Sequence, residues 1–440
     1  MHGVRRLPRV QCTRRDRGML FLMVLAVCFL VGCPRAQLMP TPNLYVQSSS
    51  SPFADIAPSL RTNTVDVLYA TDRQPVRQQD GTLMYSNKRS PSLAFGSCVV
   101  EIGDNISWET LIEASRQRAR SAKLPLYMRT ITEQGRFPAT PLPIVLNNGQ
   151  IQVDPAAQAA QDEVAAQLRQ TLRERLASTS RKDVYVYIHG FNNSFTDAAF
   201  VMAELWHFLG REGVPIIYTW PAGAGGGLRG YTHDRESGEY TLFHLKQFLR
   251  ILATTPEVER IHLIAHSRGT DVATSALREL FIEARGAGKD LRSVSKLSNV
   301  VLAAADLDME VVYQRLGAER VGLGIDRITI YVSETDRAIG FSGCLFVSAR
   351  RIGQMRPEDL TAEQRRDLEV GARTQIIDAR VSTGFVGHSY FYNNPAVSAD
   401  LVLLLRDNLE PGSPGRPLVK RGENFWEITE GYPMVPAGRP

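Results

Sequence analysis

Short hydrophobic runs alternate with longer helical patterns through the second half of the chain. Each run holds five or six mostly apolar residues and is bounded by turn-forming residues. The runs occupy residues 184–188, 214–219, 261–265, 300–305 and 328–332. Runs without polar alternation are typical of parallel strands covered on both faces, and the helical patterns between them supply the crossovers. The pattern predicts an α/β fold with a mostly parallel central sheet and crossover helices on both faces.

Two further strands and a long helix are predicted before this region. Residues 65–70 (VDVLYA) alternate apolar and polar positions, and residues 97–102 (SCVVEI) form a second candidate strand. Residues 155–178 are rich in alanine, glutamine and leucine, with Pro155 where a first helical turn would begin. We therefore expect two leading strands of the sheet and then a long helix.

The strand and helix patterns continue across residues 63–410, which predicts a single domain. Insertions are expected near 103–154 and 340–386, and the second contains a charged helical pattern, RPEDLTAEQRRDLEV. Either insertion could form a lid over a site. The tail at 411–440 is rich in proline and glycine, which predicts an extended segment.

The first 33 residues have the composition of a targeting segment. Several arginines are followed by Met19–Gly32, fourteen residues without charge. A helix of that length spans about 21 Å, short of the roughly 30 Å hydrocarbon core of a membrane. Residues 1–32 therefore fit a signal peptide better than a membrane span, and an uncleaved signal anchor is the alternative.

The end of this segment, Leu30-Val31-Gly32-Cys33, resembles the bacterial lipobox, in which small residues precede a cysteine that is lipidated and becomes the mature N-terminus. The resemblance implies a lipid anchor on Cys33 in the bacterial cell envelope. Pro34 is similar to the residue found in lipoproteins of the outer membrane, facing the periplasm. Residues 33–62 include a serine run at 48–51 and predict a flexible tether between lipid and domain.

Beyond this segment the chain is neutral and has few cysteines. Without residues 1–33 it holds 45 basic and 45 acidic side chains. A nucleic-acid-binding protein needs a basic surface to displace phosphate counterions, so this class of function is excluded. Cys98 and Cys344 remain once Cys33 is lipidated, and the sequence leaves open whether they form a bridge or stay free thiols.

A candidate nucleophile follows the strand at 261–265. Ala265-His266-Ser267-Arg268-Gly269 leads directly into a helical pattern, TDVATSALRELFIEA. A serine between a strand and a helix, flanked by small residues, is the context of a nucleophile elbow, in which the backbone makes a sharp turn. Here alanine replaces the first glycine of G-x-S-x-G, so the position between strand and helix carries the prediction.

Two later residues complete a candidate triad. Asp336 follows the strand at 328–332, and His388 lies in VGHSYF just before the last helical pattern. The order serine, acid, histidine is that of α/β-hydrolases, where imidazole takes the serine proton and a carboxylate fixes its tautomer. Asp306 and Asp308, after the preceding strand, are alternative acids, and they could instead cap a helix beginning near Met309.

A turn after the first core strand is the candidate oxyanion site. His189-Gly190-Phe191 ends the strand at 184–188 and opens onto a helical pattern at 196–210. In α/β-hydrolases an HG turn at this place presents a backbone N–H to the oxyanion, together with the N–H after the nucleophile. The expected donors are the amides of Phe191 and Arg268.

The remaining glycine and histidine motifs are interpreted as parts of the local structure and not as ligand sites. Gly225, Gly227 and Gly230 satisfy G-x-G-x-x-G, yet they lie several residues beyond their strand, which predicts a loop and not a dinucleotide site. His233 and Asp234 could approach the site, but helix-start signals favour Asp234 in a first turn. The remaining histidines, His207, His244 and His262, show no metal-ligand spacing, and no metal is predicted.

Several of these motifs together resemble a known family. YVYIHGFNNSF, YTWPAG, LIAHSRGT, VVLAAADLD and GHSYFYNNP look like a bacterial α/β-hydrolase family of unknown function, esterase- or lipase-like, in its lipoprotein branch. The resemblance covers residues 63–410. It implies the α/β-hydrolase fold and a hydrolase activity.

The sequence therefore predicts a lipid-anchored serine hydrolase that forms an acyl-enzyme on Ser267. A carboxylesterase or lipase acting on a small-molecule or lipid ester fits best, with no cofactor, and acyl transfer or amide cleavage would use the same groups. The alternative is a non-catalytic envelope lipoprotein that uses the hydrolase fold as a binding or scaffold module.

Overall fold

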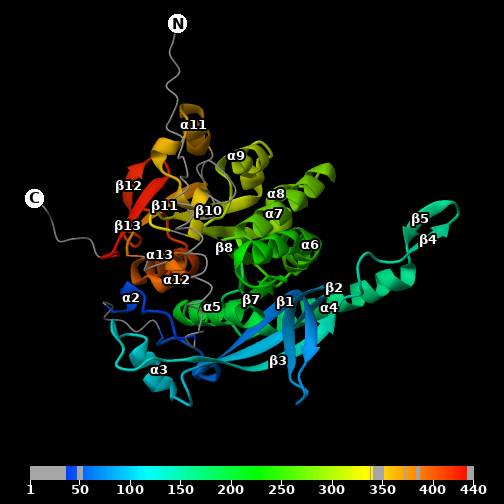
Figure 1. Cartoon of the computed structure of the whole chain (residues 1–440), viewed down its shortest axis with the longest axis horizontal. Coiled ribbons are helices and arrows are strands. Elements are labelled where there is room, and N and C mark those ends of the chain that lie inside the picture. Colours follow the sequence, from blue (N-terminus) through cyan, green and yellow to red (C-terminus); the bar gives the residue numbers. More distant parts are fainter. Residues whose placement is uncertain are drawn as a thin grey trace, which may run out of the picture.

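One large sheet crosses the whole molecule (Figure 1). The structure is a computed structural model that describes residues 36–46, 53–336, 338–339, 351–370, 373–382 and 387–433. Within these residues, eleven strands follow the order β12-β13-β11-β10-β9-β8-β6-β7-β1-β2-β3. The central strands are parallel, as the alternation of strands and helices predicts.

The parallel centre consists of the buried runs predicted from the sequence. These strands are β6 (Asp183–Ile188), β7 (Val214–Thr219), β8 (Arg260–His266), β9 (Leu297–Ala303) and β10 (Ile325–Val332). Every residue of β6, β7 and β9 is buried, because helices cover both faces of the sheet. The α/β architecture with a mostly parallel sheet is thereby confirmed.

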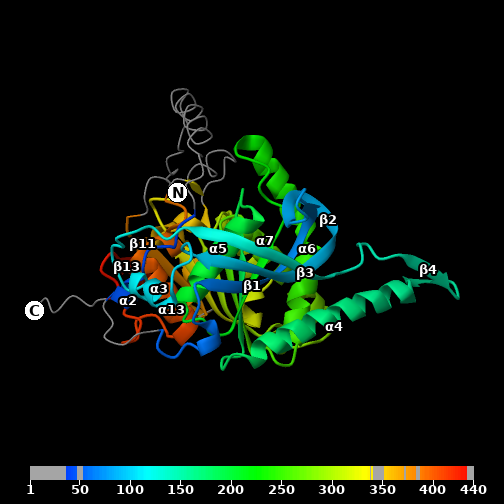
Figure 2. The same cartoon turned by 90° about the horizontal axis from the view of Figure 1, so that it is seen from below.

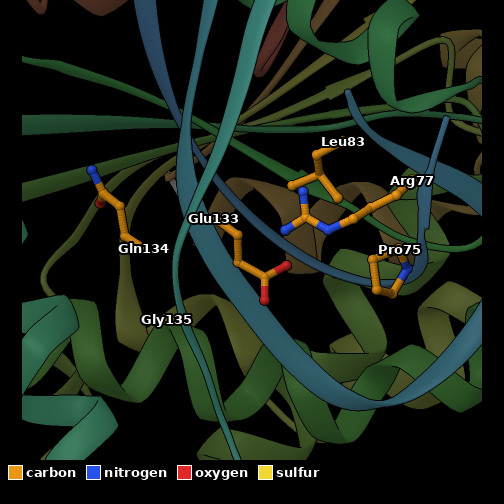
Figure 3. A pocket seen from close by; sticks show the side chains of 6 residues that line it. All are labelled: Pro75, Arg77, Leu83, Glu133, Gln134 and Gly135. Atoms are coloured by element: carbon orange, nitrogen blue, oxygen red, sulfur yellow. The ribbon is translucent and has the colours of Figure 1, made fainter. Parts of the chain in front are cut away.

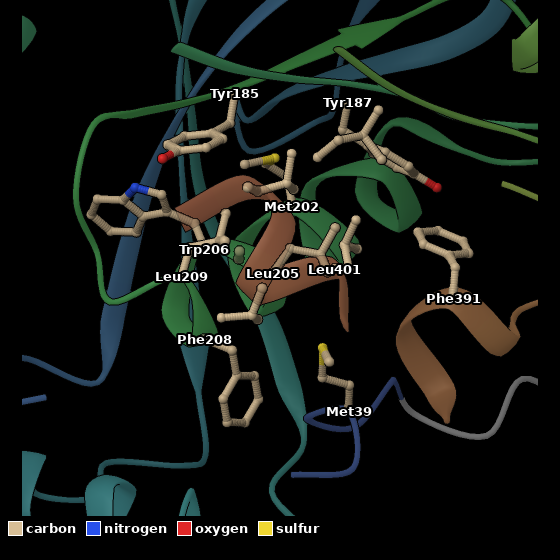
Figure 4. Close-up of a cluster of buried hydrophobic side chains, with 14 of the residues drawn as sticks. Met39, Tyr185, Tyr187, Met202, Leu205, Trp206, Phe208, Leu209, Phe391 and Leu401 are labelled. Carbon is tan, nitrogen blue, oxygen red and sulfur yellow. The ribbon is translucent and has the colours of Figure 1, made fainter. Parts of the chain in front are cut away.

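Alternate residues of each strand enter two separate cores. Tyr185 and Tyr187 of β6 face a core formed with α5 (Phe195–Phe208), α12 (Tyr390–Asn393) and α13 (Pro395–Asp407), part of which appears in Figure 4. Val184 and Val186 face the opposite core. That second core packs against α4 (Pro155–Ala177), α6 (Gly227–Thr254), α7 (Gly269–Gly286) and α8 (Leu291–Ser295).

Three antiparallel strands extend the sheet on one side. They are β1 (Thr64–Arg77), β2 (Leu83–Ile102) and β3 (Leu126–Arg136), and β1 pairs in parallel with β7. The segment near 103–154, predicted to be an insertion, thus contributes a strand to the sheet as well as α3 (Trp108–Ala114). The sequence analysis did not predict β3. Its sequence, LYMRTITEQGR, is that of a half-exposed edge strand.

A small hairpin lies outside this sheet, just before α4. Its strands are β4 (Ile144–Asn147) and β5 (Gln150–Val153), joined through Asn148 and Gly149, both with positive φ, as a tight hairpin turn requires. Figures 1 and 2 show the hairpin projecting away from the rest of the molecule. Ile144, Leu146 and Ile151 are exposed on it.

The opposite edge of the sheet is built from segments that the sequence analysis did not assign to the sheet. β11 (Thr374–Arg380) lies within the predicted insertion at 340–386 and pairs with β10. The predicted extended tail supplies β12 (Val419–Gly422) and β13 (Phe425–Thr429), and β13 pairs in parallel with β11. Phe425 and Ile428 are buried there, which explains why this glycine-rich tail is held to the domain.

The segment predicted as a flexible tether is partly docked. Leu38, Met39 and Tyr45 are buried against α5 and α13, and α2 covers Asn43–Val46. The backbone N–H of Met39 donates to Glu204 of α5. Apolar contacts and this buried hydrogen bond fix a stretch whose sequence shows no periodicity.

Short helical turns complete the described connections: η1 (Pro58–Leu60), α9 (Met309–Val312), η2 (Tyr313–Gly317), η3 (Val321–Gly324), η4 (Ile352–Gln354), η5 (Pro357–Asp359) and α11 (Ala362–Val370). In the described part of the chain, no helix has the length and apolarity needed to cross a membrane. The predicted signal peptide, Cys33 and Cys344 lie outside the described residues, and Cys98 is a buried free thiol.

Candidate active site

Ser267 occupies a sharp turn between β8 and α7. Its φ is +52°, a left-handed conformation that is rare for serine and is typical of a nucleophile elbow. A Cβ on Gly269 would lie 2.3 Å from the carbonyl oxygen of His189, and a Cβ on Gly190 would lie 2.7 Å from Cβ of Ser267. Both glycines are therefore required by close backbone approach. Ala265 still belongs to the strand and needs no positive φ, so alanine is accommodated in place of the motif's first glycine.

Ser267, His388 and Asp336 form a continuous hydrogen-bonded chain. The Oγ atom of Ser267 lies 2.6 Å from Nε2 of His388, and Nδ1 of His388 lies 2.8 Å from Oδ2 of Asp336. The carboxylate is fully buried, and the imidazole is about one-fifth exposed. The structure thus brings together the three residues singled out in the sequence, from the ends of β8 and β10 and from the segment before α12.

The buried Asp336 carboxylate has backbone partners as well as His388. Its Oδ1 atom accepts hydrogen bonds from the amides of Ala338 and Ile339, both at 3.1 Å. These bonds fix the orientation of the side chain, so that Oδ2 faces Nδ1 of His388.

His266 supports the imidazole of His388 from the side, a contact that the sequence analysis missed. The two rings lie 4.8 Å apart, and Nε2 of His266 is 3.0 Å from the carbonyl oxygen of His388. Burial lowers the pKa of His266 to about 3, so this neighbour stays neutral. A neutral ring places no second charge beside His388. Its position directly before Ser267 was the only sequence signal.

The turn after β6 lies against the nucleophile. The contact between Gly190 and Ser267 places the amide of Phe191 beside the elbow. Within the described residues, neither the Phe191 amide nor the Arg268 amide donates a hydrogen bond to another protein atom. Two unengaged N–H groups beside a nucleophile are the arrangement that stabilises an oxyanion.

Comparison with known protein families gives a match over residues 164–406, more than half of the chain. The matching family is described as "Alpha/beta hydrolase of unknown function (DUF900)". The chain belongs to this family. No curated protein matches the sequence. Membership agrees with the resemblance and supports a hydrolase-type function, and the matched range includes Ser267, Asp336 and His388.

The two alternative acids have other partners in this α/β hydrolase. Asp308 caps α9 by accepting hydrogen bonds from the amides of Glu310 and Val311. Asp306 accepts from the hydroxyl of Tyr231 at 3.0 Å and lies 3.6 Å from a guanidinium nitrogen of Arg351. The carboxylate bonded to His388 is that of Asp336.

The structure corrects the position of Asp234. α6 begins at Gly227, so Asp234 lies beyond the first turn in which it was expected. Its carboxylate is fully buried and accepts hydrogen bonds from the amides of Asn192 and Gly223. It therefore contacts the turn that also carries Phe191, whereas the sequence favoured a plain helix start.

The glycines of the G-x-G-x-x-G pattern belong to the start of α6 and the loop before it. A Cβ on Gly230 would lie only 1.8 Å from the carbonyl oxygen of Gly225, so the loop packs directly on the helix. Gly225 and Gly227 have positive φ, and a side chain at either would strain the backbone. These glycines serve the local backbone geometry.

The other histidines named above are buried, and each has a polar partner of its own. His207 lies 2.8 Å from the hydroxyl of Ser115, His244 lies 3.0 Å from Asp72, and His262 lies 3.3 Å from Asp183. Within the described ranges, no group of three or more His, Cys, Asp or Glu side chains is placed to hold a metal ion.

A cavity of about 370 Å³ lies on the antiparallel side of the sheet (Figure 3). Pro75, Arg77 and Leu83 line it together with residues 133–135 of β3. It shares no residue with the Ser267 site.

Proposed function

We propose that this α/β hydrolase is a serine hydrolase that cleaves carboxylic esters, of small molecules or lipids, through an acyl-enzyme on Ser267. The hydrogen-bonded chain from Ser267 through His388 to Asp336 carries the proposal. A serine hydroxyl is a weak nucleophile, and an imidazole at 2.6 Å that is itself held by a carboxylate is the arrangement that activates it.

In the first step His388 acts as a general base. The proton of the Ser267 hydroxyl moves to Nε2 as Oγ bonds to the ester carbonyl carbon, and the carbonyl electron pair moves onto its oxygen. The amides of Phe191 and Arg268 stabilise that negative oxygen. Preorganised donors of this kind lower the barrier by several kcal/mol, because they need no reorientation when the charge develops.

In the second step the tetrahedral intermediate collapses. The bond from the carbonyl carbon to the alcohol oxygen breaks, and that oxygen takes the proton from Nε2 of His388. Water then attacks the acyl-enzyme with His388 again as base, releasing the carboxylic acid and restoring Ser267. Asp336 keeps Nδ1 protonated, so Nε2 is the atom that accepts each proton.

We also propose that Cys33 is lipidated and holds the enzyme at the outer membrane, facing the periplasm. The lipobox-like sequence before Cys33 supports this proposal. Leu38 and Met39, five and six residues after Cys33, are buried in the domain. The enzyme would therefore sit close to the lipid surface. Loss of detergent-phase partitioning in Cys33→Ala would support the anchor, and unchanged partitioning would contradict it.

Ester turnover tests the proposed chemistry. We expect p-nitrophenyl esters of increasing acyl length to be hydrolysed by the wild type and not by Ser267→Ala. Ser178→Ala is the matched control, because Ser178 is an exposed serine at the end of α4. Equal turnover in Ser267→Ala and wild type would refute the acyl-enzyme. A folded wild type without turnover on any ester would favour the scaffold alternative.

A further inference from the structure

Two buried side chains of opposite charge hold the loops beside the nucleophile. Arg73 lies on β1 and Asp234 on α6, and both are almost completely buried. We propose that Arg73 and Asp234 are positioning residues that fix the Phe191 amide as an oxyanion donor. This inference rests on the proposed serine-hydrolase function, and we call the two residues the Arg73–Asp234 clamp.

The clamp holds the loop after β7 by a single peptide group. Nη1 of Arg73 donates to the carbonyl oxygen of Ala222 at 2.8 Å, and the amide of Gly223 donates to Asp234 at 3.2 Å. These are the C=O and N–H of the same peptide bond. Because a peptide is planar, bonds at both ends fix its orientation.

The clamp also holds the turn after β6, through two different peptide groups. The amide of Asn192 donates to Asp234 at 2.8 Å, and Nη2 of Arg73 donates to the carbonyl oxygen of Asn193 at 2.7 Å. Asn192 has a φ of +55°, a left-handed conformation that the two bonds help to maintain. The chain is thus fixed at the residue directly after Phe191.

On the other side of Phe191, Arg73 acts through His189. Nε2 of His189 accepts from the amide of Trp220 and lies 3.2 Å from Nη2 of Arg73, so the ring proton is on Nδ1. Nδ1 lies 3.0 Å from the carbonyl oxygen of Gly190 and donates to it. Burial holds the pKa of His189 well below its usual range, which keeps the ring neutral and this tautomer fixed.

The direction of the Phe191 amide follows from this bond. Gly190 C=O and Phe191 N–H belong to one trans peptide, in which the two groups point in opposite directions. With the carbonyl held by His189, the N–H points away from His189, and among the described residues it donates to no protein acceptor. Bonds on both sides of Phe191 therefore set the donor before substrate arrives.

The electrostatics of the clamp are consistent with a permanent role. Burial lowers the pKa of Arg73 to about 10, which still leaves the guanidinium charged at neutral pH. Two buried ions are costly unless their hydrogen-bonding capacity is used. Here Arg73 and Asp234 each form hydrogen bonds to backbone groups of the same two loops, and these bonds fix the geometry of the loops.

The test compares Asp234→Asn with wild type, using an ester substrate and butylboronic acid. The boronate forms a tetrahedral adduct with an active serine, and its oxygen occupies the oxyanion site. We expect kcat to fall by roughly 10- to 100-fold with KM nearly unchanged, and the boronate Ki to rise by a similar factor. A merely structural role would lower the folded fraction and hence kcat, but it would leave Ki unchanged.

Two more variants make the test decisive. Arg73→Lys keeps the charge but loses the planar fork, and we expect the same rise in Ki. Asp400→Asn is the control, because Asp400 is equally buried and paired with Arg416, away from the loops; it should not raise Ki. An unchanged Ki in Asp234→Asn and Arg73→Lys would overturn the clamp alone. A wild type that neither turns over ester nor binds boronate would overturn the proposed function and the clamp together.

Discussion

His388 and Asp336 are 52 residues apart in the chain, and their side chains meet at 2.8 Å between Nδ1 and Oδ2. The contact selects one acid from the three that the sequence offered. It also fixes which nitrogen of His388 faces Ser267. The pairing of these two residues is therefore the basis of the first prediction.

Asp336→Asn should lower kcat by about three to four orders of magnitude, because an amide can hold the imidazole in the wrong tautomer. Asp306→Asn is the matched variant, since Asp306 bonds to Tyr231 and Arg351 instead. We expect a much smaller loss there. Steady-state ester kinetics on both variants check the assignment, and the reverse ranking would move the acid to Asp306.

Close packing at the elbow gives the second prediction. Gly269→Ala would bring a methyl group to 2.3 Å from the His189 carbonyl oxygen and displace the turn. We expect a loss of about 1–3 kcal/mol in stability and a severe loss of activity. Gly286→Ala lies at the other end of α7 with open space around it, so it should be neutral or slightly stabilising. Urea unfolding and ester turnover of both variants measure the contrast; equal effects would refute the packing argument.

The docked N-terminal segment gives the third prediction. Met39 is 1% exposed against α5, whereas Leu146 on the β4–β5 hairpin is 74% exposed. Met39→Ala should cost about 2–5 kcal/mol of unfolding free energy, and Leu146→Ala less than about 0.5 kcal/mol. Chemical denaturation can compare the two. A neutral Met39→Ala would mean that the segment is a tether after all.

The fourth prediction concerns pH. Burial raises the pKa of Glu204 to about 8 from its ordinary 4.5. Between these values the folded chain keeps a proton that the unfolded chain releases, so stability falls as pH rises through this window. Its contribution is complete below the lower value and lost above the upper one. The loss should be on the order of a few kcal/mol.

Glu204→Gln isolates this effect, because glutamine can still accept the hydrogen bond from Met39. Melting temperatures from about pH 5 to about pH 9 should decline less steeply in the variant than in the wild type. Parallel pH curves would show that Glu204 does not titrate in this range.

The sequence was sufficient where one local pattern determines the structure. β6, β7, β8 and β9 each contain a mostly apolar run, because strands buried on both faces do not alternate apolar and polar residues. The elbow at Ser267 was predicted from its place between strand and helix. The turn at His189-Gly190-Phe191 was predicted on the same local grounds, and the oxyanion role of the Phe191 and Arg268 amides stays a prediction.

The edges of the sheet could not be read in this way. β3 and β11 carry charged residues because they lie near the edges or close to exposed turns, so their patterns resemble those of loops. The segment at 36–46 is fixed by contacts with α5 and α13 that have no counterpart in its own sequence. Local pattern carries no information about such partners.

The same limit applies to the site. The sequence indicated that Asp234 could approach the site. Its carboxylate accepts hydrogen bonds from the amides of Asn192 and Gly223, and these contacts form only in the folded chain. Arg73 was not singled out at all, because an arginine in a β-strand gives no signal of burial. Both residues act through backbone groups, which one sequence cannot reveal.

The central claim is that His388 and Asp336 activate Ser267. It is tested most directly by intact-mass analysis of the full chain, extracted in mild detergent, after exposure to a fluorophosphonate. We predict one adduct on the wild type and none on Ser267→Ala or His388→Ala. An adduct that persists in Ser267→Ala, or its absence from a well-folded wild type, would contradict the account.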